Sequence, residues 1–231
     1  MRPITPPIKR SEPVTADTPP IRVDIVSDVV CPWCAIGYYQ LAKAVRETGI
    51  EVDIHWHPFE LNPQMAPEGE NLREHLAAKY GTTPEGSRQA RARLTEMGAA
   101  LGFTFNYADD MRMYNTFRAH QLIGWAEEQG KAHEVKLALF AAFFSRREDV
   151  SSIEVLAGVA AATGLDGDAA RAMLDSGERA EQVREREQFW TSRGVRGVPA
   201  MIFERQHLVS GAQGEENYAS ILRQLKAAQA A

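Results

Sequence analysis

Two cysteines, Cys31 and Cys34, are the only ones in this 231-residue chain, and they stand in the segment Cys-Pro-Trp-Cys. Two thiols at this spacing can close a small disulfide ring. An apolar run over residues 21–26 precedes them, and a helical pattern of apolar residues follows. A thiol pair at a strand-to-helix junction is typical of a redox-active dithiol. The spacing therefore predicts thiol–disulfide exchange.

The position of each thiol predicts its role. A thiolate attacks a disulfide, whereas a neutral thiol does not. Cys31 should lie at the first turn of a helix, where unpaired N–H groups lower a thiol pKa from about 8.5 toward 7 or below. Cys34, one turn further on and facing inward, is placed to attack the mixed disulfide and release the substrate. We therefore expect Cys31 to be the nucleophile and Cys34 the resolving thiol, with Pro32 suited to the helix start.

The residues around the pair favour a moderate redox potential. Trp33 supplies no positive charge next to Cys34, and Asp28 lies three residues before Cys31, where its carboxylate would oppose thiolate formation. We therefore expect a potential of about −270 to −200 mV, and not one as oxidising as about −120 mV.

Two other uses of the cysteines are less well supported. Zinc needs four ligands, and the chain has no second Cys-x-x-Cys; His55 and His57 would have to complete the site. The two histidines alternate with apolar residues on one strand, where exposed polar residues are expected anyway. A purely structural disulfide is rare in the cytoplasm. The pattern favours redox chemistry, and no metal is expected.

The expected elements form two separated halves. A strand over 21–27, a helix to about residue 48 and an alternating edge strand over 50–57 make a right-handed parallel βαβ unit. Residues 63–177 read as about five dissimilar helices, one of them capped by Asn115. A polar helix over 178–190, a hairpin of strands 200–203 and 207–210, and a last helix complete the chain.

This order predicts an α/β protein with a thioredoxin-like fold and a four-stranded mixed sheet, split by a large all-helical insertion. We expect a thioredoxin-like domain over 21–62 plus 178–231, a helical insertion domain over 63–177, and a disordered tail over 1–20, which holds six prolines. The first strand should be central in the sheet.

Val198 and Pro199 precede the first strand of the hairpin. A cis proline at this position would expose the preceding backbone N–H and C=O beside the thiols, where an extended substrate segment could bind. We therefore expect Pro32, Trp33, Val198 and Pro199 to contact substrate. His120 is more simply read as a surface or core histidine.

Composition limits the partners. The formal charge of −5 gives no reason to expect nucleic acid or an anionic membrane as a partner. No apolar run reaches the roughly 20 residues of a membrane span, and the N-terminus lacks the apolar region of a secretory signal. These features favour a cytoplasmic protein, in which a lone Cys-x-x-Cys is transient and catalytic.

Four segments together resemble the FrnE-like branch of the DsbA family of thiol-disulfide oxidoreductases. They are residues 27–34 (SDVVCPWC), 59–63 (FELNP), 115–120 (NTFRAH) and 197–199 (GVP). The resemblance covers about residues 21–226. It implies a thioredoxin fold with an inserted helical domain, a nucleophilic Cys31 and a cis Pro199.

The resemblance also leaves alternatives. The same superfamily holds 2-hydroxychromene-2-carboxylate isomerases and kappa-class glutathione transferases, which typically have a serine at the position of Cys31; keeping both cysteines favours dithiol chemistry. We expect an oxidoreductase or isomerase that needs no bound cofactor beyond its own redox-active disulfide, with glutathione as a candidate co-substrate. Its partners would be a disulfide-containing protein or small molecule and a reducing or oxidising partner. A glutathione-dependent isomerase or transferase, and a non-enzymatic peptide-binding or pathway-intermediate-binding protein, remain alternatives.

Overall fold

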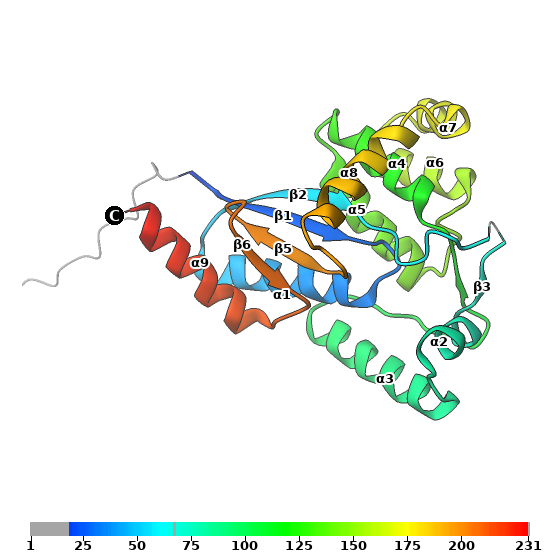
Figure 1. Ribbon diagram of the computed structural model, residues 1–231, viewed down its shortest axis with the longest axis horizontal. Helices are drawn as coiled ribbons and strands as arrows, with labels where there is room; N and C mark the ends of the chain where they lie inside the picture. Colours follow the sequence, from blue (N-terminus) through cyan, green and yellow to red (C-terminus); the bar gives the residue numbers. More distant parts are fainter. Residues whose placement is uncertain (1–18, 67, 231) are drawn as a thin grey trace, which may run out of the picture.

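The computed structural model describes residues 19–66 and 68–230 (Figure 1). The strands are β1 (Ile21–Ser27), β2 (Val52–Pro58), β3 (Glu70–Asn71), β4 (Arg112–Met113), β5 (Ala200–Phe203) and β6 (His207–Ser210). The helices are α1 (Pro32–Thr48), α2 (Leu72–Tyr80), α3 (Pro84–Ala100), α4 (Phe117–Glu127), α5 (Ala132–Phe140), the π-helical η1 (Ala141–Ser145), α6 (Ile153–Ala162), α7 (Gly167–Ser176), α8 (Ala180–Ser192) and α9 (Glu215–Gln229). Most of the expected N-terminal tail lies outside the described residues.

The main sheet has the strand order β2-β1-β5-β6. β2 runs parallel to β1, with Ile21 opposite Val52, and β5 and β6 are antiparallel neighbours. The expected four-stranded mixed sheet, with β1 inside and β2 at an edge, is confirmed. The hairpin forms at the expected residues, because its strands are apolar and its turn is short.

β1 is buried along nearly its whole length, since both faces of the sheet are covered. Ile21, Val23 and Ile25 face the side of α1 and α9, which lie together along the sheet in Figure 1. Val26 faces the other side, where it packs with Ile202 and with Trp190 near the end of α8. β2 alternates because one of its faces is partly open to solvent.

Helix α1 has clear signals at both ends. Cys31 occupies the N-cap position in an extended conformation, and Pro32 follows in the first turn, where a missing N–H costs no hydrogen bond. Gly49 ends the helix at a positive φ of 67°, and its N–H donates to the carbonyl of Val45 at 2.9 Å. The helix therefore starts at the first cysteine, as the sequence predicts.

The segment between β2 and α8 is largely helical and shares a continuous apolar core with the sheet and α1. Phe140, Phe143 and Phe144 are fully or almost fully buried within it.

Two details of this segment differ from the expectation from sequence. Asn115 accepts a hydrogen bond from the N–H of Phe117, but Thr116 takes the N-cap position of α4. The short ladder between β3 and β4 has no sequence signal, because two residues are too few for a periodic pattern.

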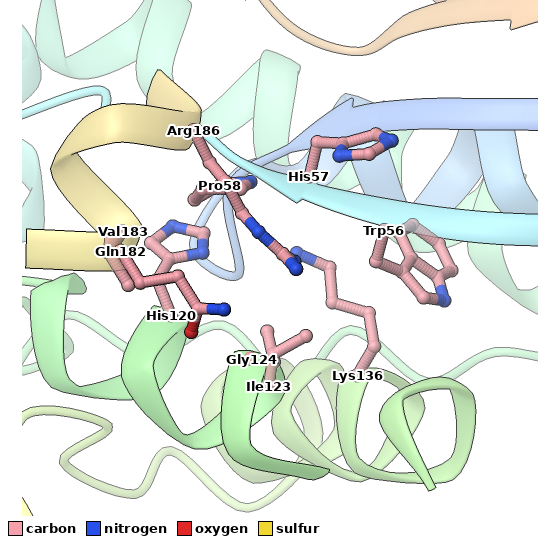
Figure 2. A pocket seen from close by; sticks show the side chains of 10 residues that line it. All are labelled: Trp56, His57, Pro58, His120, Ile123, Gly124, Lys136, Gln182, Val183 and Arg186. Carbon is pink, nitrogen blue, oxygen red and sulfur yellow. The ribbon is translucent and has the colours of Figure 1, made fainter. Parts of the chain in front are cut away.

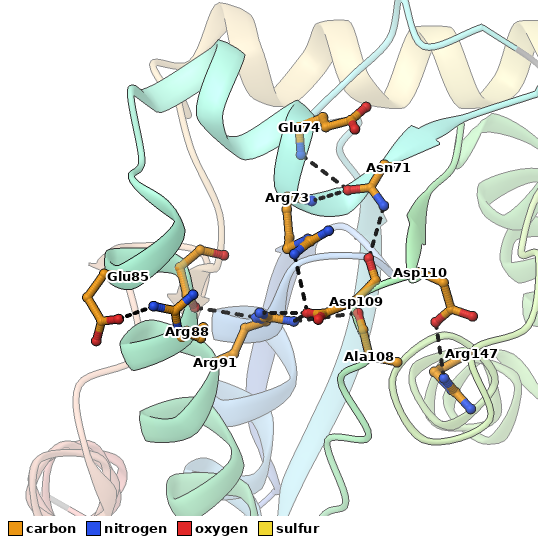
Figure 3. Close-up of polar contacts among 11 residues, drawn as sticks. Asn71, Arg73, Glu74, Glu85, Arg88, Arg91, Ala108, Asp109, Asp110 and Arg147 are labelled. Carbon is orange, nitrogen blue, oxygen red and sulfur yellow. Dashed lines mark hydrogen bonds and ion pairs between the residues drawn. The ribbon is translucent and has the colours of Figure 1, made fainter.

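Polar contacts hold α2 and α3 to the loop before β4 (Figure 3). Asn71 caps α2 by accepting from the N–H groups of Arg73 and Glu74, and its amide donates to the carbonyl of Asp109. The Asp109 carboxylate pairs with Arg73 and with Arg91 at 3.5 and 3.3 Å. Asp109 is largely exposed, so these ion pairs position the loop more than they stabilise it. Among the described residues, no helix is both long and apolar enough to cross a membrane.

His133 of α5 joins the helical segment to the sheet. Its Nε2 lies 3.0 Å from the hydroxyl of Tyr38 in α1, and its Nδ1 accepts from the indole N–H of Trp56 in β2 at 3.2 Å. An imidazole that accepts at Nδ1 must be neutral or lose that hydrogen bond. Burial lowers the pKa of His133, which keeps the neutral form dominant.

We expect this junction to weaken as the pH falls. The pKa of His133 is lower in the folded chain than the value of about 6.5 in an unfolded chain, so its contribution is complete above that value and is lost as the pH falls below it. His133→Gln should lower the free energy of unfolding by about 1–3 kcal/mol at pH 7.5. Urea unfolding at pH 7.5 and 5.5 should show a smaller loss at the lower pH; an equal loss at both would contradict this role.

Candidate active site

The two cysteines lie where β1 passes into α1. Cys31 precedes the helix with φ −89° and ψ 112°, and the N–H of Cys34 donates to its carbonyl at 3.1 Å. Both thiols are reduced in this structure. Cys31 is 4% exposed and Cys34 is fully buried. The first thiol is therefore the more accessible one, and its neighbour lies one helical turn behind it.

The Val198–Pro199 peptide lies beside Cys31. Its bond is cis, as expected, and the Cys31 sulfur lies 3.7 Å from the Val198 carbonyl oxygen. Gly37 of α1 allows this approach, because an added Cβ would come within 3.3 Å of the Pro199 ring. The tertiary structure thus brings together Cys31 and a carbonyl 167 residues away.

The other expected contact residues flank this pair. The Trp33 side chain is 41% exposed, which is unusual for a large aromatic residue. Pro32 and Val198 are partly exposed, and Pro199 is buried. Pro32, Trp33 and Val198 therefore offer an accessible, mainly apolar border around a sulfur that is itself nearly covered.

Buried polar side chains lie behind the thiols. Asp28 is fully buried and accepts the N–H of Leu61 at 2.8 Å. Its other carboxylate oxygen lies 3.5 Å from Nε2 of His120, and this imidazole also meets the carbonyl of Phe59 at 3.1 Å. His120 is therefore a core histidine with polar partners, one of the two simple readings of the sequence.

Lys136 of α5 is the buried cation of this group. Its side chain is 1% exposed, and its ammonium donates to the carbonyl of Ser27 at 3.3 Å. The rings of Trp56 and Phe140 lie 5.3 and 5.0 Å from the ammonium, at cation–π distance. Burial lowers the pKa of Lys136 to about 8, although negative charge at Cys34 and Asp28 opposes that shift.

The surroundings raise the pKa of the Cys31 thiol well above its usual range. The causes are the hydrogen bond with Cys34, burial, and the negative charges of Cys34 and Asp28; the backbone N–H of Cys34 acts in the opposite direction. The expected lowering toward 7 is therefore wrong for this state of the protein. Helix position alone suggested it, whereas the fold also removes water from the sulfur. The expected opposition from Asp28 is confirmed in direction.

The helical segment contributes groups that the sequence did not single out. Burial raises the pKa of Tyr107, and negative charge at Cys31 adds to the shift, so its hydroxyl lies within electrostatic reach of this sulfur. Lys136 lies on the buried side of a helix whose other buried positions are apolar. A charged residue at such a position was the only sequence signal that could have marked Lys136. Nothing local marks Tyr107.

His55 and His57 do not join the cysteines. His55 contacts Asp53 at 2.7 Å, and His57 contacts Asp24 at 2.8 Å and packs against Trp190. Within residues 19–66 and 68–230, no three His, Cys, Asp or Glu side chains gather as a set of metal ligands.

Comparison with known proteins agrees with this geometry. The family described as "DSBA-like thioredoxin domain" matches residues 22–223. The crystal structure of a probable DsbA oxidoreductase, SCO1869 from Streptomyces coelicolor, is 31% identical with a TM-score of 0.82, and the match covers 88% of this chain and 89% of that one.

Two further proteins are more distantly similar. The cytosolic disulfide reductase DsbM from Pseudomonas aeruginosa, solved with GSH, is 18% identical with a TM-score of 0.62 over 89% of this chain and 99% of that one. The uncharacterized protein YwbO of Bacillus subtilis (strain 168) is 26% identical over 68% of this chain and 72% of its own length. With a four-stranded sheet, a Cys-x-x-Cys pair at the start of α1 and a family match over most of its length, the chain belongs to the DsbA-like thioredoxin domain family.

Proposed function

We propose that the chain is a thiol–disulfide oxidoreductase or isomerase in which Cys31 attacks and Cys34 resolves. The contact between the Cys31 sulfur and the Val198 carbonyl is the observation that carries the proposal. It places the more accessible sulfur beside a backbone carbonyl that an extended substrate could also meet. Family membership supports the same class of chemistry.

The reaction would proceed by two exchanges. The Cys31 thiolate attacks one sulfur of a substrate disulfide, the S–S bond breaks, and the other substrate sulfur leaves as a thiolate. The Cys34 thiolate then attacks the Cys31 sulfur, a disulfide closes between the two cysteines, and the second substrate sulfur leaves. The substrate gains two electrons, and the cysteine pair loses them.

The raised pKa of Cys31 favours reduction of substrates over their oxidation. A strongly oxidising pair depends on a stabilised thiolate in its reduced form. Here the partner thiol, burial and Asp28 all disfavour that thiolate. A thiolate of high pKa is scarce at neutral pH but is intrinsically more nucleophilic, which partly offsets its scarcity. We therefore place the potential in the expected range of about −270 to −200 mV.

The substrate would be a protein or small-molecule disulfide, and a second redox partner would return the electrons. The cytoplasmic location expected from the sequence is part of this proposal, and the structural relative DsbM bears the description of a cytosolic disulfide reductase. The same relative was solved with GSH, which favours glutathione as a candidate co-substrate here. The assignment to the FrnE-like branch is proposed on the sequence segments.

The primary prediction concerns insulin reduction by dithiothreitol. Wild-type protein should accelerate precipitation of the insulin B chain, and Cys31→Ser should leave only the uncatalysed rate, because it removes the attacking sulfur. Cys34→Ser is the matched control: it should react once and accumulate a mixed disulfide visible by mass spectrometry. Equal catalysis by wild type and Cys31→Ser would refute the proposal. Turnover with glutathione that survives Cys34→Ser would instead support a glutathione-dependent transferase or isomerase.

The charge of Asp28 should control the ionisation of Cys31. In a Cys34→Ser background, Asp28→Asn should move the pH midpoint of iodoacetamide alkylation to lower pH, because it removes a negative charge while an amide oxygen still accepts the N–H of Leu61. Asp24→Asn is a suitable control, since Asp24 is also a buried carboxylate of β1 but pairs with Arg22 and His57. Equal midpoints in the two variants would contradict the effect.

Equilibration with glutathione buffers should give a potential of the wild-type pair between about −270 and −200 mV. Asp28→Asn should shift the value upward, since it makes the reduced form easier to ionise. A wild-type value near −120 mV would show that the thiolate is stabilised, against the surroundings described above.

A further inference from the structure

A groove of about 340 Å³ lies on the face of the main sheet that packs against α8. Asp24 of β1 and Ile202 of β5 are directly opposite each other in the sheet, and both line the groove. The other contributors are the end of α8 and the turn between β5 and β6. We call this space the arginine groove, after the residues that give it its chemistry: Arg22, Phe189, Arg193, Ile202 and Arg205.

The arginine groove is separate from the thiol pair. Arg22 lies near the start of β1, about 17 Å along the strand from Ser27, whereas the cysteines follow the other end of β1. His57 of β2 also lines the groove, and Figure 2 shows its ring on the opposite side of the strand from Trp56 and Lys136. The groove therefore belongs to a part of the surface that thiol exchange does not use.

A buried carboxylate fixes one arginine of the groove. Asp24 is buried and accepts two hydrogen bonds from Arg22, at 2.8 Å from Nε and at 2.6 Å from Nη2. His57 contacts the same carboxylate at 2.8 Å. Among the described residues that line the groove, Asp24 is the only carboxylate. Its charge is engaged by Arg22 and His57, so the groove holds no carboxylate for Arg193 or Arg205.

The turn after β5 holds Arg205 at the groove. Glu204 and Arg205 adopt positive φ values of 50° and 57°, a conformation that usually favours glycine or asparagine. Two contacts keep the turn in place: the N–H of Glu204 donates to the Arg22 carbonyl at 2.9 Å, and the Glu204 carboxylate accepts the Arg22 N–H at 2.7 Å. Arg205 itself is exposed, and its guanidinium has no partner among the described residues.

The end of α8 adds an aromatic surface and a second cation. Phe189 is 45% exposed and packs edge-on against Trp190. The Arg193 guanidinium lies 3.5 Å from the centre of the Phe189 ring, and its Nη1 donates to the Phe189 carbonyl at 3.1 Å. A guanidinium has five N–H donors, so Arg193 keeps most of its donors for a ligand.

We propose that the arginine groove binds a small aromatic anion, with its ring against Phe189 and Ile202 and its acidic group paired with Arg193 and Arg205. Arginine pairs with carboxylates and phosphates in the same bidentate manner, so both belong to this class of ligand. The volume is near the lower end of the range for ligand pockets, about 300–1,000 Å³, which suits a one- or two-ring molecule. The inference does not rest on the proposed thiol chemistry.

Charge complementarity supports an anion as the occupant. The whole chain carries a formal charge of −5, yet three arginines and one engaged carboxylate line this groove. A positively charged groove on an acidic protein attracts anions locally, while the rest of the surface repels them. The exposed ring of Phe189 provides the apolar contact that a simple inorganic anion could not use.

The probe for the test is 2-naphthoate, added to isotope-labelled protein and followed by amide chemical shifts. We expect saturable binding with a Kd of about 1 mM or lower, and the largest shifts at residues 189–193 and 202–206. The neutral 2-naphthamide should bind at least fivefold more weakly. Titration with 2-naphthyl phosphate identifies the preferred acidic group, since the tighter of the two anions carries it.

Two pairs of variants locate the site. Arg205→Gln should weaken 2-naphthoate binding at least fivefold, whereas Arg223→Gln, which alters an exposed arginine of α9 on the other side of the sheet, should not. Phe189→Ala should weaken binding similarly, with Tyr80→Ala, at an exposed aromatic residue of α2, as its control. Arg205 and Phe189 are exposed, so both variants should fold, which circular dichroism checks.

Three results would overturn the inference. They are equal binding of 2-naphthamide, binding unchanged by Arg205→Gln, and shifts centred on Trp33 instead of the groove. Absence of binding would overturn it as well, and a wild-type dimer that Phe189→Ala dissociates would then assign this surface to contact between two copies of the chain. Insulin reduction by Arg205→Gln should equal that of wild type, so failure of this inference leaves the proposed function untouched.

Discussion

The contact between the Cys31 sulfur and the Val198 carbonyl is the constraint on which the site depends. It requires α1 to start at the cysteine, β5 to pair with β1, and Gly37 to leave room for the Pro199 ring. Each of these features also belongs to the core of the fold. A change that shifts the sheet relative to α1 would therefore also move the Val198 carbonyl relative to the Cys31 sulfur.

The helical segment does more than cover the sheet. His133 links it to α1 and β2, Lys136 places a cation at the Ser27 carbonyl where β1 ends, and Tyr107 lies within electrostatic reach of Cys31. These groups come from residues between the two parts of the thioredoxin-like sheet. The surroundings of the thiols thus come from the helical segment as well as from the sheet and α1, although both cysteines lie at the start of α1.

Opposing effects act on the ionisation of the Cys31 thiol. The N-terminus of α1 favours a thiolate, but desolvation, the second thiol and Asp28 disfavour it, and the second group of effects prevails. Lys136 adds a buried positive charge, which helps to keep the pKa of Asp28 low.

The sequence by itself indicated the cysteine pair, the family and most of the fold. Cys31 and Cys34, the start of α1 at Pro32, the alternation along β2 and the hairpin at 200–210 are local patterns, because backbone preference and periodicity act over a few residues. The tertiary structure alone decided the direction of the pKa shift of Cys31, the partners of Asp28, and the contacts of His120, His133 and Lys136. Their surroundings come from elements far apart in the chain, and desolvation depends on what the complete fold packs around each group.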